Sequence, residues 1–132
     1  MSIDPNGENP VVTASFGGID FAGCKLFFKK KNDPSFSTIL TFNGSGSDVF
    51  KSIFTYTIDP VAQIGPDKKI VDLVGCELNW SILFIDYGDT PFSQYSFELT
   101  IKQGNIDLLI PPFFKEGIIN DTSTTFGNRF FF

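Results

Sequence analysis

The sequence predicts an all-β protein: a single-domain antiparallel β-sandwich of about eight short strands, with a flattened β-barrel as the alternative. Three observations lead to this prediction. Apolar and polar residues alternate with period two in short runs rich in Phe, Ile, Val and Thr. Gly, Pro, Asn and Asp interrupt these runs roughly every 8–12 residues. No segment shows the sustained helical spacing of a long helix.

Length and composition predict one folded domain. A chain of 132 residues has the size of a single domain, and 42% hydrophobic with 19% charged residues argues against disorder. Seventeen phenylalanines supply large apolar rings for a core. We expect residues 1–10, MSIDPNGENP, to form a flexible polar arm and residues 11–132 to form the sandwich.

The first strands follow one another between turn residues. Residues 11–16 alternate as a strand, Gly17 and Gly18 form a turn, and residues 19–30 form a long strand. A KNDPS turn then returns the chain along 36–42, and an NGSGSD loop follows.

The middle of the chain is less regular. A cap at Ser47 or Asp48 favours at most one short helical turn near 48–53, after which 54–58 alternates like a strand. Residues 59–69 contain two prolines that break regular pairing, so they form the longest predicted loop.

The clearest strand pattern lies in residues 77–86 and 95–101, which we expect to pair as a hairpin. In this register one face is wholly apolar and the other is mixed, so a slip of one residue would destroy the pattern. The apolar face contains Trp80, Ile82 and Phe84 opposite Ile101, Leu99 and Phe97.

A second hairpin is predicted at residues 103–106, where Gly and Asn suit a two-residue turn. It would place Leu108 and Ile110 on the same apolar face, opposite Ile101 and Leu99. The proline pair that follows would then end the strand, because proline cannot donate to a sheet ladder.

The chain ends in TTFGNRFFF, which the same alternation predicts to be a final strand docked in the sheet. Phe126, Phe130 and Phe132 fall on its inward face. Phe131 falls on the other face beside Arg129, so these two residues are candidates for a subunit or partner contact.

Composition and motifs argue against an enzyme and against nucleic-acid binding. The chain has no histidine, which removes Ser-His-Asp and Cys-His catalysis and the commonest metal ligand. It has no GxxxxGK[ST] or GxGxxG motif, and its acidic DPNGE segment lacks the remaining positions of a calcium loop. The net charge is −5, with no basic stripe for phosphates. We expect no catalysis, no cofactor, no metal site and no nucleic-acid partner.

The sequence also shows no targeting or membrane segment. No basic region followed by an apolar run opens the chain, and no run approaches the ~20 apolar residues of a membrane helix. We expect a cytoplasmic protein without a transmembrane segment. In that compartment Cys24 and Cys76, which lie in apolar stretches, are expected to be buried free thiols.

These patterns favour a non-enzymatic structural or interaction module. It would self-assemble as a homo-oligomer, or hold a protein partner, through an apolar sheet face or an edge strand. Leu83 and Ile85 give one predicted strand a second apolar face, which indicates a strand that is central or covered by another subunit. The expected interface residues are therefore Phe131, Arg129, Leu83 and Ile85.

The alternative is a lectin-like module that binds a glycan through the loop at 86–95. Carboxylates, an amide and tyrosine rings supply the hydrogen-bonding groups and amphipathic rings that a sugar requires. The same residue types are also ordinary turn formers. The candidate sugar-binding residues are Asp86, Tyr87, Asp89, Gln94 and Tyr95.

Overall fold

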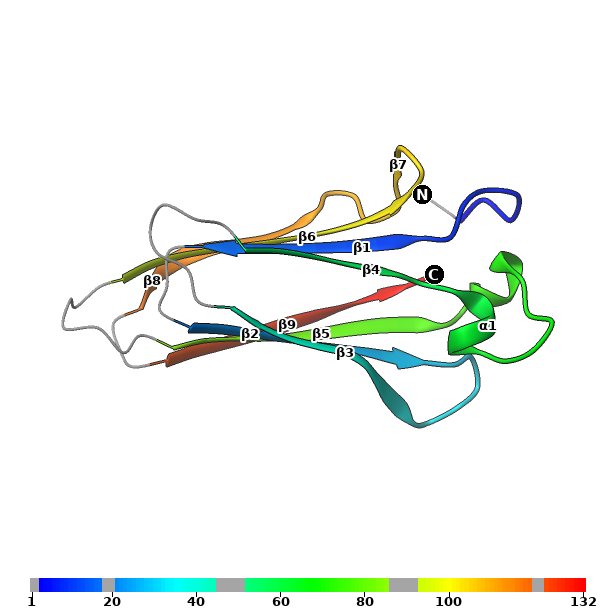
Figure 1. Cartoon of the computed structure of the whole chain (residues 1–132), viewed down its shortest axis with the longest axis horizontal. Helices are drawn as coiled ribbons and strands as arrows, with labels where there is room; N and C mark the ends of the chain where they lie inside the picture. Colours follow the sequence, from blue (N-terminus) through cyan, green and yellow to red (C-terminus); the bar gives the residue numbers. More distant parts are fainter. Residues whose placement is uncertain (1–2, 18–20, 45–51, 86–92, 120–122) are drawn as a thin grey trace.

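Two antiparallel sheets packed face to face make up the protein. A computed structural model describes residues 3–17, 21–44, 52–85, 93–119 and 123–132. Figure 1 shows the two sheets as separate layers, with the short helix α1 at one end. The sheets share no strand and each ends in edge strands, so they do not close into a barrel. The predicted β-sandwich is confirmed.

Sheet A has five strands, and β6 lies in its interior. β1 pairs with β4 on one side and β6 on the other, while β7 and β8 both pair with the far side of β6. The strands are β1 (Val11–Gly17), β4 (Ser52–Thr57), β6 (Ser93–Gln103), β7 (Ile106–Asp107) and β8 (Phe113–Ile119).

Sheet B has four strands in the order β3-β2-β5-β9. They are β2 (Phe21–Lys29), β3 (Phe36–Gly44), β5 (Glu77–Ile85) and β9 (Ser123–Phe131). The antiparallel pairing of β2 with β3 confirms the predicted return after the KNDPS turn. β2 and β5 are central, which explains why Phe27 and Leu83 place half-buried apolar side chains on the outer face.

Two short helical turns lie between β4 and β5. α1 (Pro60–Gln63) begins where the Asp59 carboxylate accepts a hydrogen bond from the Val61 amide at 3.0 Å. η1 (Ile70–Leu73) is a 3-10 turn that follows it. α1 lies within the segment predicted as the longest loop. Of the helical turn predicted near 48–53, the first four residues lie outside the described residues and the last two begin β4.

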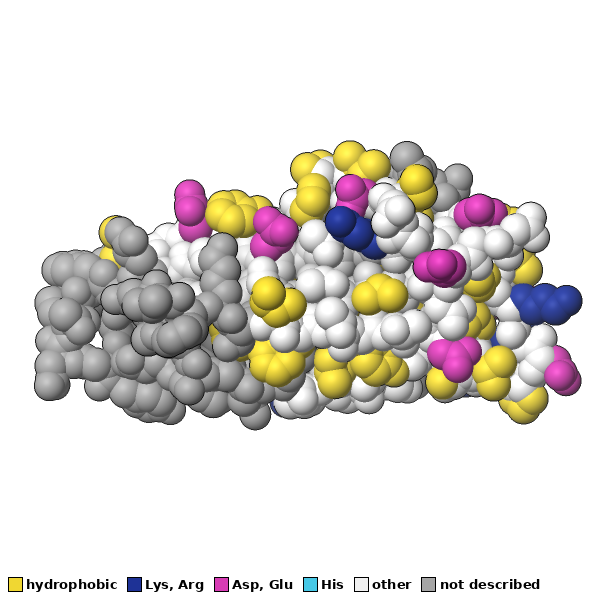
Figure 2. Space-filling model, turned by 45° about the horizontal axis from the view of Figure 1, so that its top comes forward, with side chains coloured by type: hydrophobic (Ala, Val, Ile, Leu, Met, Phe, Trp, Pro, Cys, Tyr) yellow, Lys and Arg dark blue, Asp and Glu magenta, His cyan; other side chains and the backbone are white. Residues whose placement is uncertain are grey.

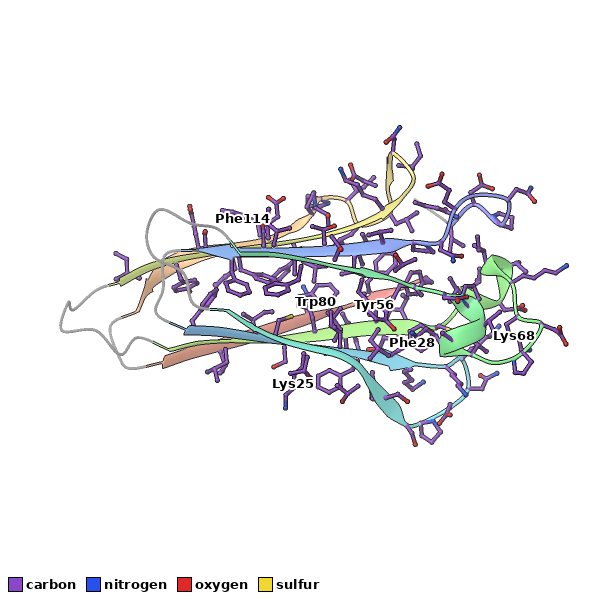
Figure 3. The ribbon with its side chains drawn as sticks, in the orientation of Figure 1. Lys25, Phe28, Tyr56, Lys68, Trp80 and Phe114 are labelled. Atoms are coloured by element: carbon purple, nitrogen blue, oxygen red, sulfur yellow. The ribbon has the colours of Figure 1, made fainter. Side chains whose placement is uncertain are left out.

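The core lies between the two sheets, where Figure 3 shows Trp80. There Phe84 of β5 contacts Phe16 of β1 and Tyr95 of β6. β5 and β6 belong to different sheets, so the predicted hairpin between them is wrong. β2 and β9 occupy both edges of β5, which leaves only its face for β6. The predicted apolar faces are nevertheless confirmed. At most 1% of each of these side chains is exposed: Trp80, Ile82, Phe84, Phe97, Leu99 and Ile101.

Trp80 points into the core as predicted and links the two sheets. Its ring lies 5.6 Å from the ring of Phe113 on β8, in an edge-to-face contact. Among the described residues, the Trp80 Nε1–H is buried without a hydrogen-bond partner. Such a group costs about 1–3 kcal/mol, so packing alone accounts for the stabilisation that this indole provides.

The β6–β7 hairpin is confirmed, but its apolar face is shorter than predicted. The Leu108 amide donates to the Ile101 carbonyl at 2.7 Å, and Leu108 is buried as expected. Ile110 is 61% exposed instead of facing Leu99. After the proline pair, Phe113 of β8 takes the place opposite Leu99. The prolines therefore interrupt the ladder on this side of β6 and do not end it.

β9 is docked in sheet B, as predicted for the end of the chain. It pairs with β5 in one antiparallel register without a shift. The Phe132 amide donates to the Cys76 carbonyl at 3.0 Å, which extends this register to the last residue. Phe130 packs partly buried against the core, whereas Phe131 is 55% exposed, as predicted. The side chain of Phe126 lies outside the described residues.

Residues 3–10 lie against the sandwich. The Asp4 amide donates to Gln103 Oε1 at 2.8 Å, and Gln103 Nε2 donates to the Asp4 carbonyl at 2.6 Å. Gln103 is buried, and Ile3 packs against the core. These contacts attach the described part of the arm to β6, while the flexibility of residues 1–10 stays a prediction.

We predict that deletion of residues 126–132 prevents soluble folding. β5 would lose most of its β9 partner, and the core would lose the cover of Phe130 and Phe132. Soluble yield and thermal melting by circular dichroism measure the effect. Val61→Ser is the control, because this side chain is 51% exposed on α1, away from β9, so its loss should leave yield and melting unchanged. A truncated chain that melts like the full chain would contradict the prediction.

We predict that Gly127→Ala lowers the free energy of unfolding by about 1–3 kcal/mol. A Cβ at this position would collide with the backbone carbonyl of Trp80, which cannot move without opening the β5–β9 ladder. Urea unfolding measures the change. Thr125→Ala, also exposed on β9, should change stability by less than about 0.5 kcal/mol. Equal midpoints for the two variants would show that the ladder shifts freely at Gly127.

Candidate functional site

The sheet edges differ in how well they are protected from pairing with another chain. β3 contains an extra residue, Ile39, because its register with β2 shifts between Thr38 and Leu40. β4 is only six residues long. β8 follows the proline pair, and its Lys115 lies in register with the buried Phe97, on the core side of an edge strand. Bulges, short length, prolines and inward charges all oppose edge-to-edge pairing.

β9 has none of these protective features. Its nine residues, STTFGNRFF, include no proline and one charge, and its register with β5 is unshifted. Within the described residues, no strand pairs with its other side. We call the backbone of Ser123–Phe131 on the side away from β5 the β9 edge. It is the sheet edge most open to a further strand.

Alternation along β9 decides which backbone groups reach the β9 edge. The Phe132 amide points toward β5, since it bonds to the Cys76 carbonyl. In an antiparallel ladder, hydrogen-bonding direction alternates from residue to residue. The amides of Phe131, Arg129 and Gly127 therefore point to the β9 edge. In the single chain the Arg129 amide donates to Asn128 Oδ1 at 2.8 Å, so a pairing strand has to replace that bond.

The side chains beside the β9 edge combine an exposed ring with nearby charges. The guanidinium Cζ of Arg129 lies 5.4 Å from the centre of the Phe131 ring, a cation–π contact. Glu77 lies in register between Phe131 and Lys29 and is 7% exposed. An apolar ring thus stands on a surface where both signs of charge are present.

The structure brings together two of the four predicted interface residues. Phe131 and Arg129 lie next to each other on the outer face of β9. Leu83 is half-buried on the outer face of β5, six positions along that strand from Glu77, or roughly 20 Å from the Phe131 row. The side chain of Ile85 lies outside the described residues. Leu83 therefore belongs to a different part of the sheet B surface.

The predicted glycan loop is only partly described. Tyr95 is 9% exposed, and its ring centre lies 4.9 Å from that of Phe84. Its ring also covers Gly117, where an added Cβ would meet the Tyr95 hydroxyl at 2.7 Å. Tyr95 is therefore a core residue and does not offer its ring to a ligand. The rest stay predictions: Asp86, Tyr87 and Asp89 lie outside the described residues, and the side chain of Gln94 is not described.

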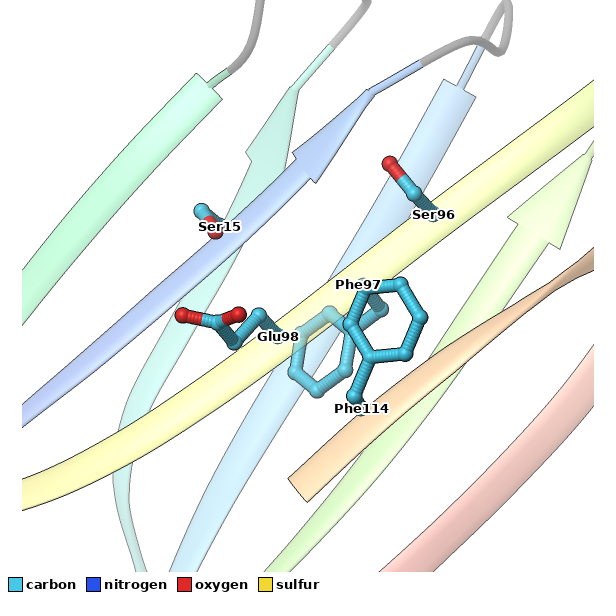
Figure 4. A pocket seen from close by; sticks show the side chains of 5 residues that line it. All are labelled: Ser15, Ser96, Phe97, Glu98 and Phe114. Atoms are coloured by element: carbon cyan, nitrogen blue, oxygen red, sulfur yellow. The ribbon is translucent and has the colours of Figure 1, made fainter. Parts of the chain in front are cut away.

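The sequence patterns do not reveal a second surface, a shallow pocket of about 80 Å³ on the outer face of sheet A (Figure 4). We call it the Phe114 pocket. Its residues come from three strands, which explains why no local motif marks it. The sequence contains one indication of it. Successive side chains of a strand point to opposite faces, so one ring of the Phe113-Phe114 pair must face outward. The pocket is lined by Ser15, Ser96, Phe97, Glu98 and Phe114.

Both cysteines are buried and free, as predicted. Burial raises the pKa of the Cys24 thiol from its ordinary 9.0 to about 12. Burial also raises the pKa of Cys76, whereas a hydrogen bond from the Lys31 backbone opposes this shift. The Cys76 Sγ donates to the Asp72 carbonyl at 3.6 Å. Protonated, enclosed thiols are poor nucleophiles, so neither residue forms a reactive site at neutral pH.

The described part of the chain contains neither a membrane-spanning helix nor a metal-ligand cluster. Its helical turns are far too short and polar to cross a bilayer. No three His, Cys, Asp or Glu side chains of these residues lie close enough together to hold a metal ion. No family model, curated protein or solved structure matches the chain. Its function is therefore inferred from its surfaces.

We predict that both thiols resist modification in the folded state and that stability falls as pH rises above about 9. The folded state keeps the Cys24 proton up to a pKa of about 12, whereas the unfolded chain releases it near 9.0, so alkaline pH favours unfolding. Ellman's reagent at neutral pH should react only after urea is added. Cys24→Ala should lessen the fall in melting temperature between pH 9 and 12. Rapid reaction of the native protein would contradict the assignment.

Proposed function

We propose that the protein is a non-enzymatic structural module that self-assembles into a homodimer by pairing the β9 edges of two copies. The observation that carries this proposal is the contrast between the edges. β3, β4 and β8 each carry a feature that opposes pairing, whereas β9 is long, unshifted and unprotected.

A second copy is the occupant that this edge suits best, because β9 can pair with itself. A twofold axis perpendicular to the sheet makes the two β9 strands antiparallel and keeps both cores on one side. The two copies of sheet B, four strands each, would then form one continuous sheet. Registers centred on Gly127 or on Asn128 both use the amides that point to the β9 edge.

Charge does not oppose these registers, although the chain carries −5 overall. Arg129 is the one charged residue of β9. In the two registers it lies opposite Thr125 or Gly127 of the second copy, so the two arginines do not face each other. Phe131, now 55% exposed, would lie opposite Ser123 or Thr125 of the second copy and become covered.

Other features fit a structural role without catalysis. The two thiols are enclosed and protonated, and Glu98 in the Phe114 pocket is exposed to solvent. The free thiols fit a reducing compartment, and we place the protein in the cytoplasm.

Size-exclusion chromatography with light scattering tests the proposal. The wild-type chain should give a mass twice the 14.7 kDa of one chain, and should dissociate on dilution. Arg129→Pro should give the mass of one chain, because it removes an amide that faces the β9 edge and none that faces β5. A wild-type chain that stays monomeric at high micromolar concentration would contradict the proposal.

Two matched variants separate loss of pairing from loss of folding. Arg129→Lys keeps the backbone amide and the charge, so it should remain dimeric. Asn128→Pro removes an amide that faces β5, so it should unfold the protein rather than yield a folded monomer. An Arg129→Pro protein that is folded and still dimeric would show that another surface joins the copies, or that a different protein uses β9.

A further inference from the structure

A transverse row of side chains crosses the outer face of sheet A. Ile53 of β4 is in register with Ser15 of β1, Ser15 with Glu98 of β6, and Glu98 with Phe114 of β8. Ser96 is the next outward residue along β6. Since neighbouring strands lie about 4.8 Å apart, the groups between Ser15 and Phe114 span about 10 Å. The Phe114 pocket is the part of this row that runs over β1, β6 and β8.

Phe114 supplies an apolar platform in this pocket. It is 54% exposed, and Figure 3 shows it on the side of sheet A away from the core. Its neighbour Phe113 already fills the inward position, against Trp80. The exposed face of an aromatic ring carries partial negative charge and attracts the positive edges of C–H groups. Phe114 is therefore available to stack on the C–H face of a ligand ring.

Three polar side chains flank this platform and can bond a ligand. Glu98 offers carboxylate acceptors, and Ser15 and Ser96 each offer a hydroxyl that donates and accepts. In the described part of the chain, none of the three makes a side-chain hydrogen bond or an ion pair. Figure 4 shows the Glu98 carboxylate on the Ser15 side of β6 and the Phe114 ring on the other side. Their hydrogen-bonding capacity is directed to the surface.

The charge around the Phe114 pocket selects against anions. Among the described residues, no lysine or arginine lines it. Glu116 of β8 lies in register with Ser96, on the same outer face as Glu98. Figure 2 shows acidic side chains next to hydrophobic ones on this side of the molecule. The two carboxylates Glu98 and Glu116 on this face disfavour phosphate, sulfate and acidic sugars.

From these observations we infer that the Phe114 pocket is a glycan subsite that holds one pyranose ring of a neutral or amino sugar. A pyranose presents an apolar C–H face to Phe114 and hydroxyls to Glu98, Ser15 and Ser96. An exposed aromatic ring beside a few hydrogen-bonding groups matches the apolar face and the hydroxyls of such an amphipathic ligand. The subsite lies on sheet A, so it does not use the β9 edge, which belongs to sheet B.

Titration of the ¹⁵N-labelled full chain, followed by amide chemical shifts, tests this inference. The probes are the methyl β-pyranosides of glucose, galactose and mannose, together with glucosamine. At least one should shift amides in β1, β6 and β8 around the pocket in a saturable manner. Phe114→Ala should weaken this binding about tenfold or more, and Glu98→Gln severalfold. Glucuronate should bind more weakly than the matching neutral glucoside.

Ile118→Ala is the matched control, because Ile118 is 51% exposed on the same strand and face but lies outside the pocket. It should leave binding unchanged. Cyclohexanol and tetramethylammonium separate sugar recognition from simple apolar or cation binding. The inference is overturned by the absence of saturable shifts with every sugar, by shifts that survive Phe114→Ala in a folded variant, or by equal shifts with either control compound.

Discussion

The burial of the inward faces of β5 and β6 between the two sheets is the constraint on which the rest of the structure depends. Each strand has neighbours on both edges in its own sheet and contributes side chains that are at most 1% exposed. Each such side chain contributes about 1.5–3 kcal/mol relative to an exposed one. Because these side chains must point into the core, the residues that alternate with them on β5 and β6 point to the outer faces of the sheets.

Two pairs of adjacent phenylalanines show which side chains this alternation places on the outer faces. In Phe113-Phe114 and Phe130-Phe131, the first ring of each pair packs against the core. The second ring of each pair faces outward, and these two are 54% and 55% exposed. The core does not require them. One stands in the Phe114 pocket and the other beside the β9 edge, so both candidate surfaces contain an aromatic ring that packing of the monomer does not explain.

The two proposed surfaces lie on different sheets and are compatible with each other. A twofold axis perpendicular to sheet B would place both copies of sheet A on the same side of the extended sheet. A dimer joined through β9 would therefore present two Phe114 pockets in one direction. Two weak subsites that engage one glycan-bearing surface together bind far more tightly than either alone. Self-assembly would then give a shallow sugar site a useful affinity.

The sequence by itself determined the direction of side chains. Alternation is a property of the local backbone, so the inward faces of β5 and β6, the exposed Phe131 and the buried Trp80 were all predictable. Local turn chemistry likewise predicted the β2–β3 return and the turn at Gly104. The Asp59-Pro60 cap of α1 was also present in the sequence, although two prolines in that segment favoured a loop.

Only the tertiary structure decided which strand pairs with which. β5 takes β2 and β9 as neighbours rather than β6, because the same apolar face can be buried by a hairpin or by a sandwich, and alternation is identical in both. In the same way, alternation allows either Ile110 or Phe113 to lie opposite Leu99 of β6, and in the structure Phe113 does so. The Phe114 pocket and the open β9 edge exist only after strands distant in the chain have been ordered, since pairing results from competition among non-local partners.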